Sequence, residues 1–167
     1  IVEDYFRQED GPRSHALVMK GATAAESSDA VTTRKGASVA RMLELWLGQK
    51  EFKAGLKAYF EKNSYQSVTT DDFFKAVLEA NKKEKDKDLK GFKDSWVNKK
   101  GYPVIYPEFS FGSSQVTVTI RQQNSNPGEK GPFTFKLPIV IHRENEPQYT
   151  VKQTILVDKP EVKVTFD

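Results

Sequence analysis

The spacing of apolar residues separates a helical first part of the chain from a β-rich second part. Between residues 36 and 47, apolar side chains recur every three or four positions, as they do along one face of an α-helix. These side chains are Val39, Met42, Leu43, Trp46 and Leu47. Gly48 follows them and predicts the end of this helix. Comparable stripes predict three further helices, over about 49–62, from about Thr69 onward, and over about 87–99.

The apolar period changes from 3.6 to 2 near Gly101. Farther on, Val116, Val118 and Ile120 alternate with threonines, a pattern typical of a half-buried strand. Five or six such short segments follow one another up to residue 166, with turn residues between them, and they predict a small antiparallel β-sandwich. The predicted fold class is α+β, with an N-terminal α-helical bundle in residues 1–100 and the β-sandwich in residues 101–167.

Composition supports a packed core and excludes several classes of function. The chain has 167 residues, of which 37% are hydrophobic and 11 are Phe. Its net charge of +3 comes from interleaved acids and bases, so we expect no nucleic-acid partner. The absence of cysteine excludes disulfides and thiolate chemistry. No apolar run reaches the roughly 18 residues that a membrane-spanning helix needs, so we expect no membrane partner.

Single residues give no catalytic site. The two histidines, His15 and His142, are far apart and lie in no zinc-binding spacing, so we expect neither to bind a metal. No Gly-x-Ser-x-Gly segment or glycine-rich phosphate loop is present. Asp71 and Asp72 begin a predicted helix, where acids are stabilising, and this structural role accounts for them.

One stretch is not explained by helix packing. Residues 32–37, Thr-Thr-Arg-Lys-Gly-Ala, immediately precede the apolar face of the first predicted helix. The segments around this stretch occur in a characteristic order. They are Ser14-His15-Ala16-Leu17, Ser28-Asp29-Ala30-Val31-Thr32-Thr33-Arg34-Lys35-Gly36-Ala37, Arg41-Met42-Leu43, Leu47-Gly48 and Gly101-Tyr102-Pro103.

This order resembles the zinc aminopeptidase N-like (gluzincin) family over roughly residues 10 to 120. In that family a Ser-His-Pro segment precedes Phe-Asp-x-Ile-x-Tyr-x-Lys-Gly-Ala, a helix ending in Met-Leu, and a Leu-Gly turn. Its Gly-Tyr-Pro segment marks the passage from the helical half of the catalytic domain into a β-sandwich domain. The resemblance therefore implies a fragment that covers the C-terminal helical part of the catalytic domain and the sandwich.

The family's chemistry is zinc-assisted removal of N-terminal residues from peptides. A His-Glu-x-x-His helix and a later Glu hold the metal, the motif Glu acts as general base, and a Tyr stabilises the oxyanion. By this resemblance the zinc ligands and the base precede Ile1, so we expect zinc only in a full-length parent and no activity from this chain alone. The implied partners are a peptide substrate of the parent and the upstream catalytic half of the same protein.

Thr33 occupies the position of the family's catalytic Tyr, two residues before Lys-Gly. A threonine hydroxyl is too short to replace the phenol, and two alternatives stay open. The parent is a degenerate, catalytically weak relative that keeps the scaffold, or it takes its oxyanion donor from another residue. The alternative function is a non-catalytic scaffold or protein-interaction module derived from the aminopeptidase fold. Lys35 is a conceivable substitute cation, but we expect it to be a capping or solvated residue ahead of the helix.

Overall fold

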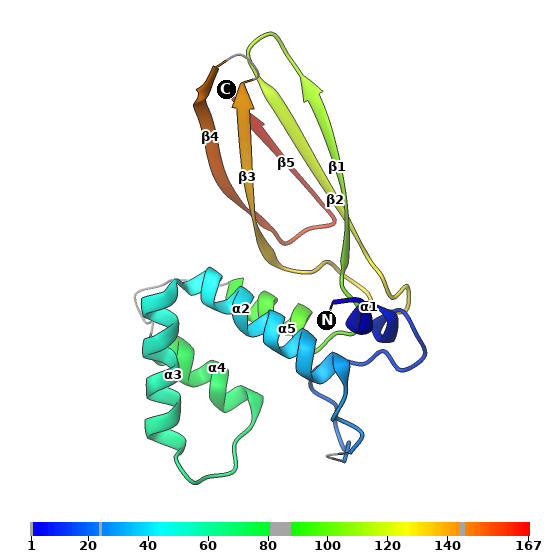
Figure 1. Ribbon diagram of the computed structural model, residues 1–167, viewed down its shortest axis with the longest axis vertical. Coiled ribbons are helices and arrows are strands. Elements are labelled where there is room, and N and C mark those ends of the chain that lie inside the picture. Colours follow the sequence, from blue (N-terminus) through cyan, green and yellow to red (C-terminus); the bar gives the residue numbers. More distant parts are fainter. Residues whose placement is uncertain (1, 24, 81–87, 144–145) are drawn as a thin grey trace.

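The structure is a computed structural model that describes residues 2–23, 25–80, 88–143 and 146–167 (Figure 1). All helices precede all strands, which confirms the predicted α+β class. The helical elements are α1 (Val2–Glu9), a π-helical turn (Val31–Lys35), α2 (Gly36–Leu47), α3 (Gln49–Asn63), α4 (Thr70–Ala80) and α5 (Asp88–Trp96). None of the described helices is long and apolar enough to cross a membrane.

Helix ends follow the sequence signals closely. The helix predicted over 36–47 has these bounds, and Gly48 follows it with a φ of 93°, a conformation that favours glycine. At the start of α4 the Thr69 backbone N–H and hydroxyl donate to Asp72 Oδ2 at 2.8 and 2.7 Å. This reciprocal cap confirms the structural role predicted for Asp72. The fourth helix ends at Trp96 rather than at residue 99, and its predicted beginning at residue 87 lies outside the described residues.

The strands form two antiparallel sheets, as the predicted sandwich requires. They are β1 (Pro103–Phe111), β2 (Val116–Asn124), β3 (Phe135–Arg143), β4 (Glu146–Val157) and β5 (Glu161–Phe166). One sheet has the order β1-β2-β5 and the other pairs β3 with β4. Figure 1 shows both sheets extending away from the layer of helices.

The core is continuous between the helices and the sandwich. Buried apolar residues of α2, α4 and α5 belong to the same cluster as those of β2, β3 and β4. Trp96, at the end of α5, packs its ring 4.9 Å from that of Phe133, and its indole N–H donates to the Thr134 carbonyl at 2.8 Å. Lys136 donates to the Trp46 carbonyl at 3.2 Å and lies 4.5 Å from the Trp46 ring centroid. The two parts therefore share one packed interface.

Strand β1 is an edge of its sheet. Gly112 N–H donates to the Gln115 carbonyl and closes the β1–β2 hairpin, so alternation along the ladder turns the N–H positions of odd-numbered β1 residues toward the free edge. Pro107 has no N–H and interrupts this edge. The side chains of Phe109 and Phe111, opposite the inward-facing Val118 and Val116, remain 59% and 77% exposed.

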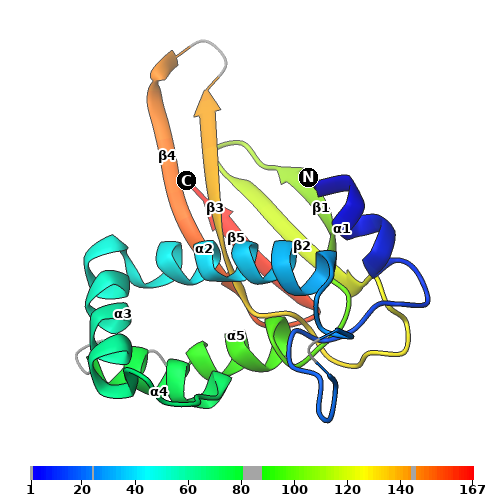
Figure 2. The ribbon, with the colours of Figure 1, turned by 60° about the horizontal axis from the view of Figure 1, so that its bottom comes forward.

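Helix α1 is set apart from the other helices. Figures 1 and 2 both show it beside the beginning of β1, on the side of the molecule away from α3. This placement brings residues near the start of the chain into contact with residues around position 100. The candidate site lies at this junction.

Candidate functional site

The stretch that carries the family resemblance folds as the π-helical turn Val31–Lys35, which runs directly into α2. Side chains two residues apart in a helical turn point to nearly opposite sides. Val31 and Lys35 are buried, with 0% and 1% of their surface exposed, whereas Thr33 between them is exposed. One face of the turn therefore anchors it to the protein, and the other presents residue 33.

Thr33 is engaged locally. Its hydroxyl donates to the Asp29 carbonyl at 2.7 Å, and its backbone N–H points to the same oxygen at 3.1 Å. A hydroxyl bonded in this way satisfies its own helical turn.

A cavity of about 600 Å³ opens beside Thr33. We call it the junction cavity, because it lies where α1, the π-helical turn, α2, the end of α5 and the start of β1 meet. Its lining is largely aromatic and aliphatic. The lining residues are Tyr5, Phe6, Thr33, Arg34, Lys35, Ala37, Ser38, Val39, Trp96, Tyr102 and Pro103.

The junction cavity contains two phenols that the sequence did not single out. Tyr102 donates its hydroxyl to Asp10, 2.8 Å from Oδ1 and 3.1 Å from Oδ2. Burial and this carboxylate raise the pKa of Tyr102 to about 12. Burial and the neighbouring Glu9 also raise the pKa of Tyr5 well above its ordinary value. Both phenols therefore keep their protons at neutral pH, and only the fold brings them to the same cavity as Thr33.

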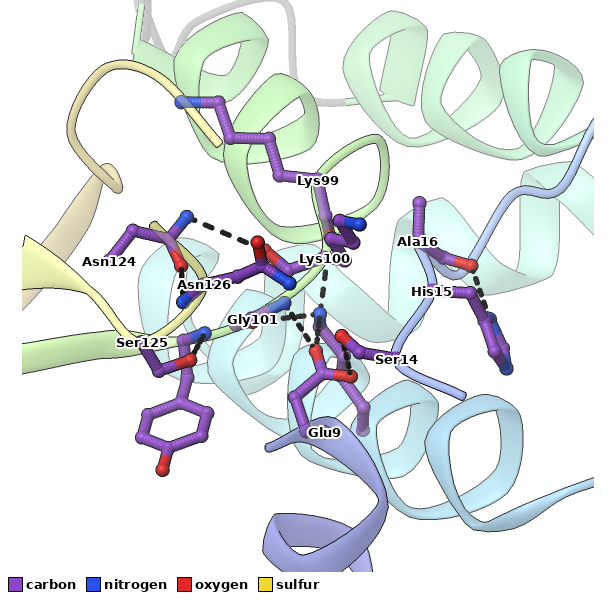
Figure 3. A network of polar contacts seen from close by, with 12 residues as sticks. Glu9, Ser14, His15, Ala16, Lys99, Lys100, Gly101, Asn124, Ser125 and Asn126 are labelled. Atoms are coloured by element: carbon purple, nitrogen blue, oxygen red, sulfur yellow. Dashed lines mark hydrogen bonds and ion pairs between the residues drawn. The ribbon is translucent and has the colours of Figure 1, made fainter. Parts of the chain in front are cut away.

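Beneath the turn lies a buried ion pair (Figure 3). Lys35 Nζ donates to Glu9 Oε1 at 2.6 Å, to the Gly101 carbonyl at 2.9 Å and to the Lys99 carbonyl at 3.2 Å. Burial lowers the pKa of Lys35, although the bond to Glu9 opposes this effect. The expectation that Lys35 is a capping or solvated residue is wrong, because Glu9 and two carbonyls take all three of its N–H donors inside the protein.

A second polar cluster holds the segment that precedes the turn. His15 Nε2 lies 2.7 Å from Asp29 Oδ2, and His15 Nδ1 lies 2.8 Å from the Ala16 carbonyl. Burial lowers the pKa of His15, but these two acceptors outweigh it and raise the pKa above its ordinary value. Burial raises the pKa of Asp29, while bonds from Thr32 N–H, His15 and Gln8 bring it down to about 2. Because both ring nitrogens face acceptors, the geometry suits a charged imidazolium.

The described residues do not provide a zinc site. Within those ranges no group of three or more His, Asp or Glu side chains could hold a metal ion. His15 is occupied by Asp29, and His142 is exposed, with Nδ1 3.0 Å from the Thr150 hydroxyl. The donor set of this part of the chain does not fit a catalytic zinc.

Comparison with known proteins identifies the family. The Peptidase family M1 domain matches residues 3–96, more than half of the chain. Glutamyl aminopeptidase of Sus scrofa is 31% identical over 143 residues, and the match covers 83% of this chain but 15% of that protein. Aminopeptidase N of Lactococcus lactis subsp. lactis is 40% identical over 79 residues, covering 47% of this chain and 9% of that protein.

A solved structure shares the fold. It is the crystal structure of Legionella pneumophila aminopeptidase A in complex with aspartic acid, which superposes with a TM-score of 0.72 at 20% identity. The match covers 98% of this chain and 19% of that one. The chain thus spans less than a fifth of the length of these relatives, and it belongs to the peptidase family M1.

Proposed function

We propose that this chain is the C-terminal helical part of the catalytic domain, with the following β-sandwich, of a zinc-dependent aminopeptidase that removes N-terminal residues from peptides. Residues 1–100 would form the catalytic-domain part and residues 101–167 the sandwich domain. Membership of family M1 supports this proposal, as do the aminopeptidase names of the similar proteins. The short share of each relative that the chain spans supports its being a part of a larger enzyme.

The observation that carries the proposal is the presentation of residue 33. The π-helical turn buries Val31 and Lys35 and exposes Thr33 beside the junction cavity. This is the orientation that an oxyanion-stabilising side chain requires, because its donor must reach a reacting group outside its own turn. The position is suited to the role, although the side chain that occupies it is not.

Thr33 itself does not supply the donor in this proposal. Its hydroxyl proton is directed to the Asp29 carbonyl within the turn. Loss of one oxyanion donor typically lowers kcat by about 10²–10³. The full-length enzyme would therefore be slow, or would use another donor, and Tyr5 is a protonated phenol on the same cavity.

The remaining catalytic groups would come from the upstream half of the same protein. Residues of that upstream half would hold the zinc, and the chemistry it would supply there is metal-ion catalysis of the hydrolysis. The aromatic lining of the junction cavity, with Tyr5, Phe6 and Trp96, suits apolar side chains of that upstream half. By itself the chain would bind no zinc stoichiometrically and would be inactive. A tight, saturable zinc site in the isolated chain by calorimetry would contradict this.

The decisive experiment uses the full-length protein. We expect it to contain zinc and to hydrolyse aminoacyl chromogenic substrates, and we expect Thr33→Tyr to raise kcat by about 10²-fold or more if the missing phenol limits the reaction. Tyr5→Phe in the natural protein tests the other donor, because it removes only the hydroxyl. A full-length protein without zinc and without hydrolysis would refute the enzyme proposal.

A second candidate function rests on the same threonine. With no phenol at position 33, the full-length protein could be a non-catalytic scaffold or protein-interaction module built on the aminopeptidase fold. Full activity in the natural protein with Thr33 would exclude this alternative. Zinc-free protein that remains inactive after Thr33→Tyr would favour it.

A further inference from the structure

We propose that Glu9 and Lys35 form a positioning device that holds the π-helical turn in one orientation and so fixes the direction in which residue 33 points. The inference rests on the proposed function only for the role of position 33. The arrangement itself consists of contacts within this chain.

The two side chains are saturated with partners and closed to solvent. The exposed fractions of the Lys35 and Glu9 side chains are 1% and 0%. Besides Lys35, Glu9 Oε1 accepts the Gly101 backbone N–H at 2.6 Å, and Glu9 Oε2 accepts the Ser14 hydroxyl at 3.1 Å. A buried ion pair is tolerated only when its remaining donors and acceptors are satisfied, and here they are.

The pair connects segments that are distant in sequence. Figure 3 shows Glu9, at the end of α1, facing the backbone of Gly101 and the side chain of Ser14. Through Lys35 the same carboxylate reaches the π-helical turn, 26 residues later, and through Gly101 it reaches the chain just before β1. Gly101 has a φ of 83°, which suits glycine, and a Cβ there would collide with Asn124. The turn is thus anchored from two sides.

The anchoring of Lys35 determines the direction in which the side chain of residue 33 points. If Lys35 turned outward, the helical geometry would rotate Thr33 toward the interior, since the two positions face opposite sides. The buried Val31 shares the inward face with Lys35 and adds an apolar contact surface. A wider π-helical turn is a local irregularity that needs such outside support, and such turns are frequent at functional sites.

This arrangement assigns Lys35 a positioning role and excludes it as a cation for the reaction. All three of its N–H donors are directed to Glu9, Gly101 and Lys99 inside the protein. Delivering the ammonium to a substrate would break these bonds and leave the Glu9 carboxylate buried without its counter-ion.

The test measures the orientation of position 33 in the chain itself. The sequence has no cysteine, so introduced cysteines are unique sites for nitroxide labels. One doubly labelled protein carries Thr33→Cys and Ala54→Cys, and its matched control carries Ala40→Cys and Ala54→Cys. All three positions are exposed, and Ala40 lies on α2, one to two turns after Lys35. Pulsed electron paramagnetic resonance gives the distance distribution for each.

We expect a single narrow distance for both label pairs in the natural background. With Lys35→Met, the 33/54 pair should lose its single narrow distance while the 40/54 pair keeps it. Because Lys35→Met risks unfolding the chain, Glu9→Gln serves as a second, nearly isosteric variant with the same expected result. An unchanged 33/54 distance in a folded variant would overturn the proposal. Equal broadening of the distance distributions of both label pairs in both variants would also overturn it, since the ion pair would then stabilise the packing of the helices and not the turn specifically.

Failure of the proposed function would leave this result intact. The label distances need no zinc, substrate or activity. If Thr33→Tyr raises the activity of the full-length protein, adding Lys35→Met to that variant should lower kcat with KM retained, as expected when a transition-state donor is misdirected.

Discussion

At the level of single residues, Lys35 and Glu9 show how burial changes the meaning of a charge. Both are buried polar residues with exposed fractions of 1%, surrounded by segments from α1, the π-helical turn and the chain before β1. On the surface, such an ion pair contributes little to the free energy of unfolding. Inside the protein, each charge needs the other to compensate for its loss of hydration. Removing either one leaves the partner desolvated without compensation.

The first prediction follows from this dependence. Lys35→Met should lower the free energy of unfolding by about 3–5 kcal/mol, because Glu9 stays buried without its counter-ion. The matched control is Lys57→Met, which breaks the pair with Glu61, where both side chains are largely exposed; its effect should be within about 1 kcal/mol. Urea unfolding followed by circular dichroism measures both. Equal effects of the two variants would contradict the prediction.

The second prediction concerns the pH dependence of the His15–Asp29 contact. Asp29 has a folded-state pKa of about 2 against an ordinary value of 3.8, so its contribution is present above 3.8 and is lost as the pH falls toward 2. His15 has a raised pKa, so its contribution is present below 6.5 and is lost as the pH rises through the folded-state value. The contact should stabilise the protein most between pH 3.8 and 6.5.

Asp29→Asn should therefore lower the free energy of unfolding by about 2 kcal/mol at pH 5, and by less at pH 8. Glu61→Gln, which removes an exposed carboxylate, is the control and should show no such dependence. Unfolding titrations at the two pH values check the prediction. An equal loss of unfolding free energy at both pH values would show that the contribution of Asp29 does not depend on the charge of His15.

At the level of elements, the approach of α3 and α4 depends on one residue without a side chain. Gly55 is buried on α3, and a Cβ there would lie 3.1 Å from both Cα and Cγ2 of Val77 on α4. Helices this close leave no room for a methyl group unless one of them moves. The sequence shows the glycine but not its neighbour.

The third prediction compares two glycines in helices. Gly55→Ala should destabilise the protein by about 1–3 kcal/mol through overpacking, despite the better helix propensity of alanine. At Gly36, the first residue of α2, the nearest atom to an added Cβ is Leu17 Cδ2 at 3.9 Å, so Gly36→Ala should be neutral or stabilising by up to about 1 kcal/mol. Thermal melting of the two variants distinguishes them. If Gly55→Ala instead stabilised the protein, α4 would have moved to make room for the methyl group, and the prediction would be wrong.

Local signals predicted the elements well because their causes are local. The apolar stripe and Gly48 gave both ends of α2, and the Thr69–Asp72 cap marked the start of α4. Alternation in β2 gave the buried Val118 and Ile120. The π-helical form of residues 31–35 was beyond these signals, since Val31 is the one apolar residue of this segment and no apolar spacing is present to distinguish the two helix types.

The candidate site was predictable only in part for the same reason. The family resemblance pointed to residues 28–37, but the partners of that stretch are distant, with Glu9 26 residues before Lys35 and Gly101 66 residues after it. Tyr5 lies in α1 and Tyr102 lies between α5 and β1, yet both line the junction cavity. No spacing rule connects such positions. The one available signal was that Lys35 interrupts an otherwise apolar or small face next to Val31 and Val39.

At the level of the whole molecule, the helices and the sandwich share one hydrophobic core. Trp96 contacts Phe133 and bonds to Thr134, and Lys136 reaches back to the carbonyl of Trp46. Contacts of this kind couple the stability of two parts that differ in secondary structure. They also place the helical part of the proposed enzyme at a fixed angle to the sandwich.

The fourth prediction is that both parts unfold together. Two probes should give coincident urea transitions: far-ultraviolet circular dichroism, which is dominated by the helices, and nuclear magnetic resonance signals of the β2 backbone amides, which report on the strands. Trp96→Ala should shift both by the same amount, corresponding to about 3–5 kcal/mol, whereas the exposed Tyr65→Ala should shift neither. Separate transitions for the two probes would indicate that the helices and strands are independent.

The open edge of β1 has a practical consequence for handling the protein. Phe109 and Phe111 place two aromatic rings beside unpaired backbone groups, a combination that promotes self-association in solution. Pro107 blocks only the middle of that edge, so its last residues remain available to another chain. Light scattering should show that Phe109→Lys keeps the protein monodisperse at higher concentration, while Tyr106→Lys on the opposite face has a smaller effect. The limit on its solubility would then lie in two residues at the tip of one strand, far from the junction where the chemistry is proposed.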